Sequence, residues 1–261
     1  MEGEFRPPVP ALSAKLPVVR RFALHPSLGT RVASIDVVES DGGQAVVLPS
    51  TSAVLGFQFR GRVQRGAQAL SLAGVTGLQG AAQTYSYAEG TGSVLVRFTA
   101  QGVACLGVPA GELTNRSVAL DELLPPTRVA ELSERLVAAR DDAERVALVE
   151  RLLVELPFAR DPVVTRALAR LSDVQAPASV ADVARELQMS ERQLERRFVA
   201  RVGLMPKRFA RLARFERALS LVRSGPALSA VAQRAGYADQ PHLVREFRSF
   251  AGEPPSAFRA R

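Results

Sequence analysis

Two arginines at a repeated position are the residues of this sequence best suited to recognition chemistry. Arg196 and Arg245 are 49 positions apart, and each lies two residues after a leucine and two residues before a phenylalanine. A guanidinium group carries several donors in one plane, so it can bond O6 and N7 of a guanine at once in the major groove of B-DNA. The repeated position therefore predicts two equivalent reading sites for a duplex.

The segments around the two arginines form an internal repeat. Residues 190–198 are followed by Gly203, Pro206 and Phe209, and residues 239–247 are followed at the same offset by Gly252, Pro255 and Phe258. Two copies are too few for a solenoid, which needs about three units or more. The repeat therefore predicts a tandem pair of small helical modules.

Capping residues indicate the helices that position the first copy. Ser179 is suited to cap a helix over residues 180–187. After a short turn, Ser190 and Gln193 have the spacing of a capping box at the start of the next helix. A helix, a short turn and a second capped helix make a helix-turn-helix motif.

A long helix is predicted to join the two copies. It runs over Pro206–Arg223 and ends at the glycine and proline of residues 225–226. Asp161, followed by a proline, opens an earlier helix. Ser229 is expected to cap a short helix and Asp239 the last long one. We therefore expect an all-α domain with two helix-turn-helix motifs and a linker helix.

The outward face of each second helix follows from its buried leucine. At about 100° per residue, an inward Leu194 leaves Arg192, Glu195, Arg196 and Val199 on the opposite face. The same face of the second copy carries Pro241, Val244, Arg245 and Arg248. Glu195 can accept a hydrogen bond from cytosine N4, and Val244 and Pro241 can contact a thymine methyl group. Two such helices about 34 Å apart would read an asymmetric site of roughly two turns.

The net charge of the chain is concentrated in the part that holds the repeat. Residues 161–261 contain 18 Lys and Arg and 10 Asp and Glu, a net charge of +8, whereas residues 1–160 contain 16 of each. A basic domain attracts a polyanion, either nucleic acid or an anionic membrane surface. We expect phosphate contacts from Ser190, Lys207, His242 and Arg248, with Arg208 and Arg211 as further candidates. Solvated charge is the alternative for each of them.

Residues 236–248, together with Gly252 and Pro255, closely resemble the signature of the AraC/XylS family of bacterial transcription regulators. The resemblance covers about residues 165–261 and includes both copies of the repeat. It implies a DNA-binding regulator of transcription, commonly an activator that contacts RNA polymerase. Family members usually also carry an N-terminal domain that senses an effector or dimerises.

The resemblance also implies which residues read the bases. Carried over by position, they are Arg192, Glu195 and Arg196 in the first reading helix and Gln240, Pro241, Val244 and Arg245 in the second. Pro241 departs from the family, which often has a small polar residue there. A hydroxyl contact at that position is therefore not expected.

The N-terminal half has the texture of a β domain. Residues 1–30 contain five prolines and no clear period, so an irregular lead-in is expected there. Short apolar or alternating runs then predict strands over 32–38, 44–48, 53–60 and 93–99. They fit a small antiparallel sandwich or barrel. The predicted fold class is therefore α+β, with two domains.

Helical periodicity returns between these two domains. Apolar stripes over 129–137 and 146–156, the second after Asp141 and Glu144 in a capping-box spacing, predict a pair of antiparallel helices. The pair can pack on the sheet or on the same pair of a second subunit. The expected organisation is a β-rich domain over 1–125, a helical pair over 126–160 that serves as linker or dimerisation element, and the DNA-binding domain over 161–261.

Several classes of protein are disfavoured by what the sequence lacks. It has no run of eighteen apolar residues, so no membrane-spanning helix is expected, and its acidic N-terminus does not resemble a secretory signal. Its one cysteine, Cys105, lies among apolar residues without a nearby base, and His25 and His242 fall in different domains. We therefore expect no metal, no cofactor, no enzymatic activity and a cytoplasmic location.

Four side chains of the β domain are candidates for a ligand pocket. They are Gln58, Tyr85, Tyr87 and Arg97, which can equally be ordinary sheet-face residues. The runner-up function makes this domain the active part, as a ligand-binding or catalytic module whose basic half attaches non-specifically to nucleic acid. A protein that binds a membrane surface is a further alternative, which the compact repeat disfavours.

Overall fold

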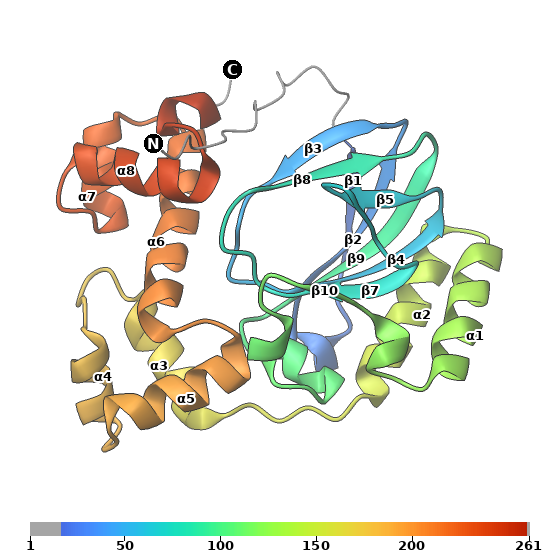
Figure 1. Cartoon of the computed structure of the whole chain (residues 1–261), viewed down its shortest axis with the longest axis horizontal. Helices are drawn as coiled ribbons and strands as arrows, with labels where there is room; N and C mark the ends of the chain where they lie inside the picture. Colours follow the sequence, from blue (N-terminus) through green and yellow to red (C-terminus); the bar gives the residue numbers. More distant parts are fainter. Residues whose placement is uncertain (1–16, 260–261) are drawn as a thin grey trace, which may run out of the picture.

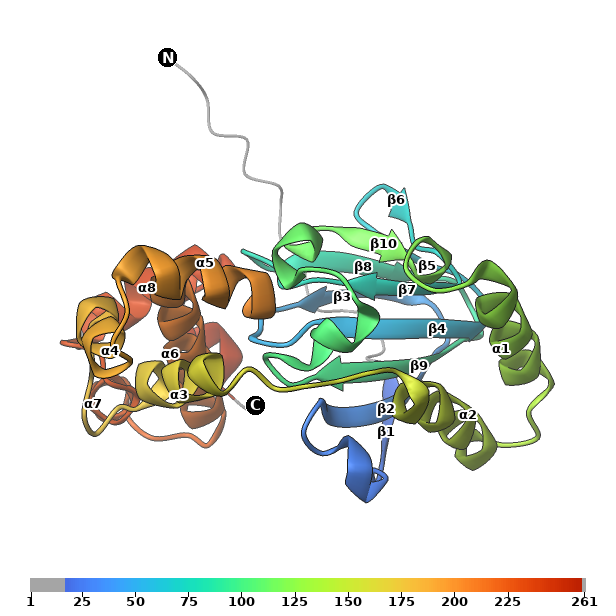
Figure 2. The same cartoon turned by 90° about the horizontal axis from the view of Figure 1, so that it is seen from below.

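The structure of the protein, a computed structural model, describes residues 17–259. A β region (residues 17–125) lies beside a helical domain (residues 161–259) (Figure 1). The helices α1 (Pro126–Ala138) and α2 (Asp142–Glu155) form a helical pair on the side of the β region that faces away from the helical domain (Figures 1 and 2). The predicted fold class, α+β with a helical C-terminal domain, is confirmed.

Two antiparallel sheets make up the β region. The larger sheet has six strands in the order β1-β2-β9-β4-β7-β10, and the smaller has four in the order β3-β8-β5-β6. The strands of the larger sheet are β1 (Val18–Phe22), β2 (Val32–Ser40), β9 (Thr91–Phe98), β4 (Val54–Arg60), β7 (Ala73–Thr76) and β10 (Ser117–Ala119). Those of the smaller sheet are β3 (Gly43–Val47), β8 (Gln83–Tyr87), β5 (Val63–Arg65) and β6 (Gln68–Ala69).

The two faces of the larger sheet differ in how they are filled. Because side chains alternate along a strand, Val94, Val96 and Phe98 of β9 lie on one face and are fully buried. Helix α1 packs against β4 and α2 against β2, so the apolar core lies between the sheet and the helical pair. The opposite face, which carries Leu95 and Arg97, lines a cavity.

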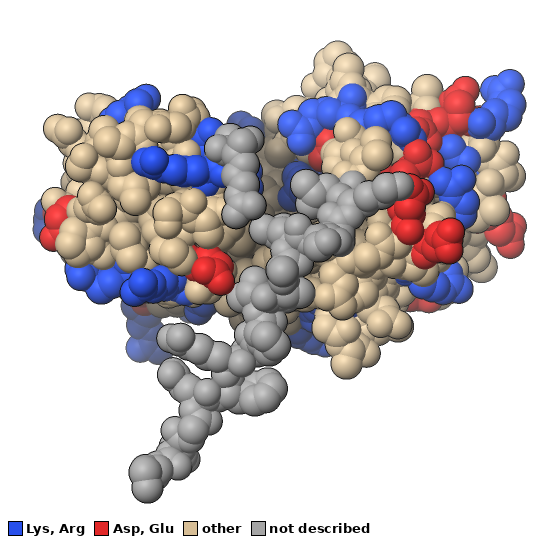
Figure 3. Space-filling view, turned by 90° about the horizontal axis from the view of Figure 1, so that it is seen from above, with Lys and Arg blue, Asp and Glu red and all other residues tan. Residues whose placement is uncertain are grey.

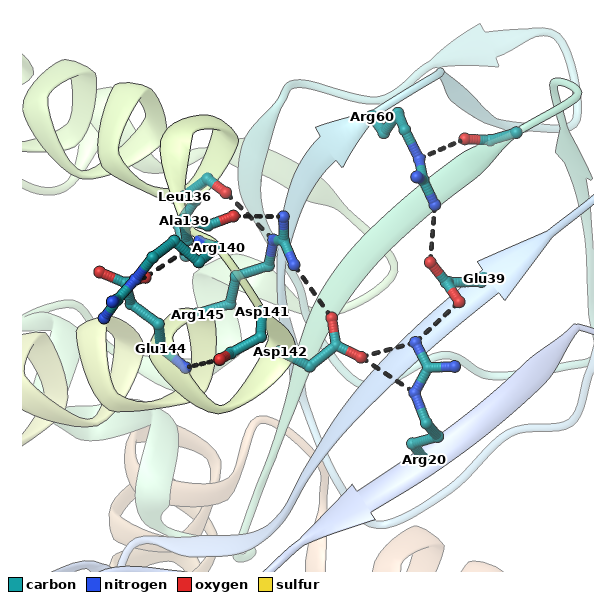
Figure 4. Close-up of polar contacts among 11 residues, drawn as sticks. Arg20, Glu39, Arg60, Leu136, Ala139, Arg140, Asp141, Asp142, Glu144 and Arg145 are labelled. Atoms are coloured by element: carbon teal, nitrogen blue, oxygen red, sulfur yellow. Dashed lines mark hydrogen bonds and ion pairs between the residues drawn. The ribbon is translucent and has the colours of Figure 1, made fainter.

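The helical pair is fixed to the sheet by a network of charged groups (Figure 4). Asp142 accepts hydrogen bonds from Arg20 of β1 at 2.6 Å and from Arg145 at 3.1 Å. Arg20 also donates to Glu39 of β2, which in turn accepts from Arg60 of β4. Of the two arrangements that the sequence left open, the structure therefore has the pair packed on the sheet.

The helical domain is built around one long helix. Its helices are α3 (Pro162–Ser172), α4 (Val180–Glu186), α5 (Glu191–Val202), α6 (Pro206–Arg223), α7 (Leu228–Ala235) and α8 (Gln240–Ala251). Helix α6 runs from α5 at one end of the domain to α7 and α8 at the other (Figure 1). Its bounds are those that the sequence predicts.

Two predictions on element starts are wrong. Ser229 does not cap α7, because that helix begins at Leu228 and its N-cap residue is Ala227. Of the predicted irregular lead-in, residues 1–16 lie outside the described residues, but residues 18–22 form strand β1. That strand pairs only with β2 and is exposed along four of its five residues, so it has no buried face to produce an alternating pattern.

Candidate nucleic-acid interface

The first helix-turn-helix motif consists of α4 and α5. Ser190 caps α5: its hydroxyl accepts from the amide of Gln193 at 3.2 Å, and the Gln193 side chain accepts from the Ser190 amide at 2.9 Å. In the turn, Gln188 has a left-handed backbone with φ of 55°, and the Met189 amide bonds to Ala184 O. The capping box predicted from the sequence therefore sets the start of α5.

The second motif, α7 and α8, repeats the arrangement with different residues. Gly236 ends α7 with φ of 80°, a conformation that favours glycine, and the Tyr237 amide bonds to Ala232 O. Asp239 caps α8 by accepting from the His242 amide at 2.6 Å. The two motifs thus share their geometry, although a serine caps α5 and an aspartate caps α8.

Buried aromatic side chains fix the rotation of both second helices. Leu194 and Phe198 of α5 are fully buried, as are the leucine and phenylalanine of residues 243 and 247 in α8. The Phe198 ring packs edge-on against Phe209 of α6, with centroids 5.4 Å apart. Because these side chains hold one face of each helix inward, the face that carries the candidate reading residues points outward.

The candidate reading residues lie on that outward face. Arg192, Arg196, Gln240, Pro241 and Arg245 are exposed, and Glu195 and Val244 are half-buried. Among residues 17–259, none of the three arginines of this group forms an ion pair or a side-chain hydrogen bond. Other arginines of the helical domain are engaged in the fold; they are Arg170, Arg185, Arg197, Arg208, Arg211, Arg214, Arg217 and Arg259.

Of the candidate phosphate contacts, some are exposed without a partner and one is packed against a neighbouring ring. Lys207 and Arg248 are exposed and, within the part of the chain that the structure describes, have no side-chain partner. His242 is half-buried with its ring edge-on to Tyr237, and Ser190 is exposed at the start of α5. Viewed from above, the helical domain shows several Lys and Arg side chains and few acidic ones (Figure 3).

Three residues that the sequence suggested for the DNA-facing surface have other contacts, and one of them, Arg208, donates to Gly80 O of the β region at 3.3 Å. Arg211 donates to the buried carboxylate of Glu246 at 2.7 Å, which ties α6 to α8 and raises the pKa of the guanidinium. Val199 lies against Gly111 of the β region, where an added Cβ would be 3.0 Å from its Cγ1. The helical period alone predicts an outer face for Arg211 and Val199. In the structure, Glu246 of α8 contacts Arg211 and the β region contacts Val199.

Asp161 is a structural residue of the helical domain whose distant contacts the sequence did not reveal. Besides capping α3, it accepts from Arg197 of α5 at 2.6 Å. Burial opposes its ionisation, but the bonds from Arg197 and from the Val164 and Val163 amides outweigh burial and hold the pKa of the carboxyl below its ordinary value. Its N-cap position was readable from the following proline, but its distant partners were not.

A cavity of about 410 Å³ lies between the two sheets. Gly56 of β4 and Gly74 of β7 are direct register partners, and both line it, so this part of the wall has no side chains. Ser93, which is 4% exposed, also lines it, and its hydroxyl has no hydrogen-bond partner in the described structure. A volume of this size is within the range of small-molecule sites.

The four candidate ligand residues, Gln58, Tyr85, Tyr87 and Arg97, all line this one cavity. Burial raises the pKa of both tyrosines, so their phenols stay protonated at neutral pH. Arg97 lies 3.6 Å from the buried carboxylate of Asp36. The Gln58 amide donates to Leu70 O and Ser71 O and accepts from the Val63 amide, so it also shapes the wall.

The cysteine and the possible metal ligands of residues 17–259 do not form a reactive centre. Cys105 is buried, and burial raises the pKa of its thiol to about 11. Over residues 17–259, His, Cys, Asp and Glu side chains form no group that could hold a metal ion. No helix in that range is long and apolar enough to cross a membrane.

With this geometry described, the chain can be compared with known proteins. Residues 183–261 match the family model of the helix-turn-helix domain. The C-terminal segment is therefore a helix-turn-helix domain of the AraC type, and the resemblance drawn from the sequence is confirmed. Such a domain is the DNA-binding part of a transcription regulator. No curated protein matches the chain.

The chain is also similar to several solved structures. A regulator from Chromobacterium violaceum with an AraC-type DNA-binding domain is 25% identical, over 37% of this chain and 88% of that one, with a TM-score of 0.34. ToxT from Vibrio cholerae is 12% identical, over 86% of this chain and 96% of that one, with a TM-score of 0.47. The C-terminal domain of AraT, a response regulator from Geobacillus stearothermophilus, is 24% identical, over 38% and 84%, with a TM-score of 0.35.

Proposed function

We propose that this protein is a sequence-specific transcription regulator that reads two adjacent major-groove segments with α5 and α8. The observation that carries the proposal is the division among the arginines of the helical domain. Arg192, Arg196 and Arg245 are exposed and unpaired in the described structure, whereas many of their neighbours are bound to carboxylates or carbonyl groups. Free guanidinium groups on an outward helix face are what guanine recognition requires.

The remaining reading residues suit the same surface. Glu195 would accept from cytosine N4, Gln240 would bond adenine, and Pro241 and Val244 would contact thymine methyl groups. Helix α6 separates the two reading helices and has 18 residues, a length of about 27 Å. Major-groove segments on one side of a duplex are about 34 Å apart. A linker helix of comparable length supports an asymmetric site of roughly two turns, with Ser190, Lys207, His242 and Arg248 at phosphates.

We further propose that the β region controls this activity. Its cavity is suited to a small-molecule effector, with Gln58, Tyr85, Tyr87 and Arg97 in the wall. The helical pair keeps exposed apolar side chains, Val137 at 63% and Val154 at 44%, which support self-association through this pair. In this proposal the domains span residues 1–125, 126–160 and 161–261, and the protein acts in the cytoplasm, contacts RNA polymerase and is not an enzyme.

A selection from a randomised duplex library tests the proposal and supplies the site. Each bidentate contact is worth about 1–3 kcal/mol, so Arg196→Ala and Arg245→Ala should each weaken binding to the selected duplex by roughly 5- to 150-fold. Their thermal stability should be nearly unchanged. Arg151→Ala makes the same charge change on α2, away from the helical domain, and should bind like the parent. Unfolding of both reading variants would instead make these arginines structural.

The second candidate function is an active β region whose basic half attaches non-specifically to nucleic acid. The salt dependence of DNA binding distinguishes it from the first. Both candidates lose affinity as salt rises, because phosphate contacts release counterions. Only a specific regulator keeps a large preference for the selected duplex over a scrambled one at physiological salt. Equal binding of the two duplexes there would reject the first proposal.

A further inference from the structure

Two separate sets of contacts join the β region to the helical domain. One set comes from the loops between β3 and β4 and between β7 and β8, and it touches α6 and α8. The other comes from the 3-10 turn η3 (Ala110–Leu113), its neighbour Thr114 and the side chain of Gln101, and it touches α5 and the start of α3. Each reading helix is therefore held by its own part of the β region.

The first set is made by loops that also line the cavity. Thr51 donates to Glu216 of α6 twice, from its amide at 3.1 Å and from its hydroxyl at 2.7 Å. The residues on either side of it, Ser50 and Ser52, line the cavity. In the other loop, the Ala82 amide bonds to the carbonyl of Phe250 in α8 at 2.9 Å, and the next residue lines the cavity as well.

The second set has no share in the cavity. The Thr114 hydroxyl donates to the carbonyl of Gly203, the residue that ends α5, and Gly111 lies against Val199. Gln101 bonds the Asp161 amide and the Thr165 hydroxyl at 3.0 and 2.8 Å. None of the residues from 98 to 116 lines the cavity. Helix α5 is thus attached to a part of the β region that a bound molecule would not touch.

Inside the helical domain, Glu216 is next in sequence to a residue that packs against α8. It follows Phe215, a fully buried residue of α6 whose ring centroid lies 5.0 Å from that of Phe247 and 5.1 Å from that of Phe250. A displacement of Glu216 would therefore act on the aromatic contacts that set the rotation of α8. The β7–β8 loop reaches α5 less directly, because Leu78 O and the Gly80 amide bond to Asn115, the residue that follows Thr114.

We propose that the filling of the cavity is communicated mainly to the second reading helix, α8, rather than to the first. The Thr51–Glu216 and Ala82–Phe250 contacts carry the coupling, and Thr51 and Glu216 are its positioning residues. This inference rests on the proposed function and adds which half of the DNA site is regulated. A coupling of ordinary size changes affinity by about 5- to 150-fold.

A substitution that fills the cavity tests the inference without a known ligand. Ser93→Leu places a larger apolar side chain into the space where the serine hydroxyl has no partner. Binding is measured to the library-selected duplex and to two derivatives, each with one half scrambled. The half that α5 reads is identified as the one at which Arg196→Ala loses discrimination, and Arg245→Ala identifies the other.

We expect Ser93→Leu to change discrimination at the α8 half by at least about 5-fold and at the α5 half by less than about 2-fold. In a Thr51→Val background this effect should be clearly smaller, because the hydroxyl bond to Glu216 is lost while the amide bonds of Thr51 and Ala82 remain. Thr114→Val is the matched control, since it also removes a threonine hydroxyl bond between the two parts of the chain, and in that background the effect should persist. A melting curve for each variant establishes that it is folded.

The outcomes separate this inference from the proposed function. A parent protein that binds all three duplexes equally refutes the proposed function itself. If the parent discriminates, but Ser93→Leu alters both halves alike, only the α5 half or neither, the inference is wrong and the proposed function stands. The same holds if Thr51→Val leaves the effect of Ser93→Leu intact.

Discussion

The guanidinium of Arg197 donates to the carboxylate of Asp161 across 2.6 Å, whereas Arg196, the preceding residue of α5, has no partner in the described structure. Asp161 is 6% exposed and also caps α3. The pair therefore fixes α5 to α3 and leaves its neighbour free at the surface. Of these two adjacent arginines of α5, Arg197 thus has a structural role, whereas Arg196 is exposed at the surface.

Replacing each of these arginines in turn should separate stability from recognition. Arg197→Met removes the nearer charged partner of the buried Asp161 carboxylate and leaves only Arg201 at 4.0 Å, so we expect a loss of about 1–3 kcal/mol in the free energy of unfolding. Arg196→Met should change that free energy by less than about 0.5 kcal/mol, because it removes no contact. Urea denaturation of both variants measures the difference.

The pH dependence of the Arg197→Met effect provides an internal control. The folded-state pKa of Asp161 is depressed, so the stability contributed by its ionised form is present above the unfolded-state pKa and is lost as pH falls through the folded value. The gap between parent and variant should therefore narrow in acid. A gap that is the same at pH 7 and at pH 3 would mean that the arginine acts through packing alone.

The helix-turn-helix motifs were predictable because their signals are local. Ser190 and Gln193 are three residues apart, and the glycine of residue 203 adopts the left-handed conformation that ends α5. Such short-range chemistry is visible in one sequence. The outward face of each second helix followed from its buried leucine. The contacts of Val199, Arg208 and Arg211 with a distant element or a neighbouring helix do not follow from the helical period.

The contacts between the two parts of the chain were not predictable in this way. Thr51 and Glu216 are 165 positions apart, and neither stands out by composition or period. The cavity likewise depends on Gly56 and Gly74 facing each other across paired strands, and the pairing of β4 with β7 is a property of the sheet order. The side chains that line it were suggested by type alone, and only the fold brings them together.

The phosphate contacts should appear in the salt dependence of binding. Arg248→Gln and Lys207→Gln should each weaken binding to the selected and the scrambled duplex alike, and each should reduce the slope of log K against log salt by about 1. Fluorescence anisotropy at several salt concentrations measures both quantities. Arg151→Gln on α2 is the control with the same charge change. A slope equal to that of the parent would show that the mutated side chain is only solvated.

The ionised side chain of Glu216 should make the parent protein less stable at neutral pH than the variant Glu216→Gln, whose side chain is uncharged. Burial raises the pKa of this carboxyl, against the opposing effects of the Thr51 bonds and the Arg97 charge. A raised folded-state pKa means that the protonated form is favoured on folding, so stability falls as pH rises from the unfolded to the folded value. Glu216→Gln keeps an acceptor for Thr51 and should be more stable than the parent at pH 7.

The same variant should lose its advantage in acid. Below the unfolded-state pKa the parent carboxyl is protonated in both states, and the two proteins should have nearly equal melting temperatures there. Melting curves between pH 4 and pH 8 measure the difference. An advantage that grows as pH falls would mean that the ionised carboxylate is stabilised by the fold, contrary to the buried environment described for it.

Loss of the Arg145 side chain should cost more stability than loss of Arg140, the other arginine of the helical pair drawn in Figure 4. Arg145 donates to carbonyls at the end of α1, Leu136 O at 3.1 Å and Ala139 O at 2.8 Å (Figure 4). Its guanidinium also lies 4.2 Å from the centre of the Phe59 ring. Arg145→Leu leaves these acceptors unsatisfied, so we expect a loss of about 3 kcal/mol in urea denaturation. Arg140→Leu, which removes an exposed pair with Glu144, should cost less than about 1 kcal/mol. Equal losses in the two variants would show that the network does not hold the pair on the sheet.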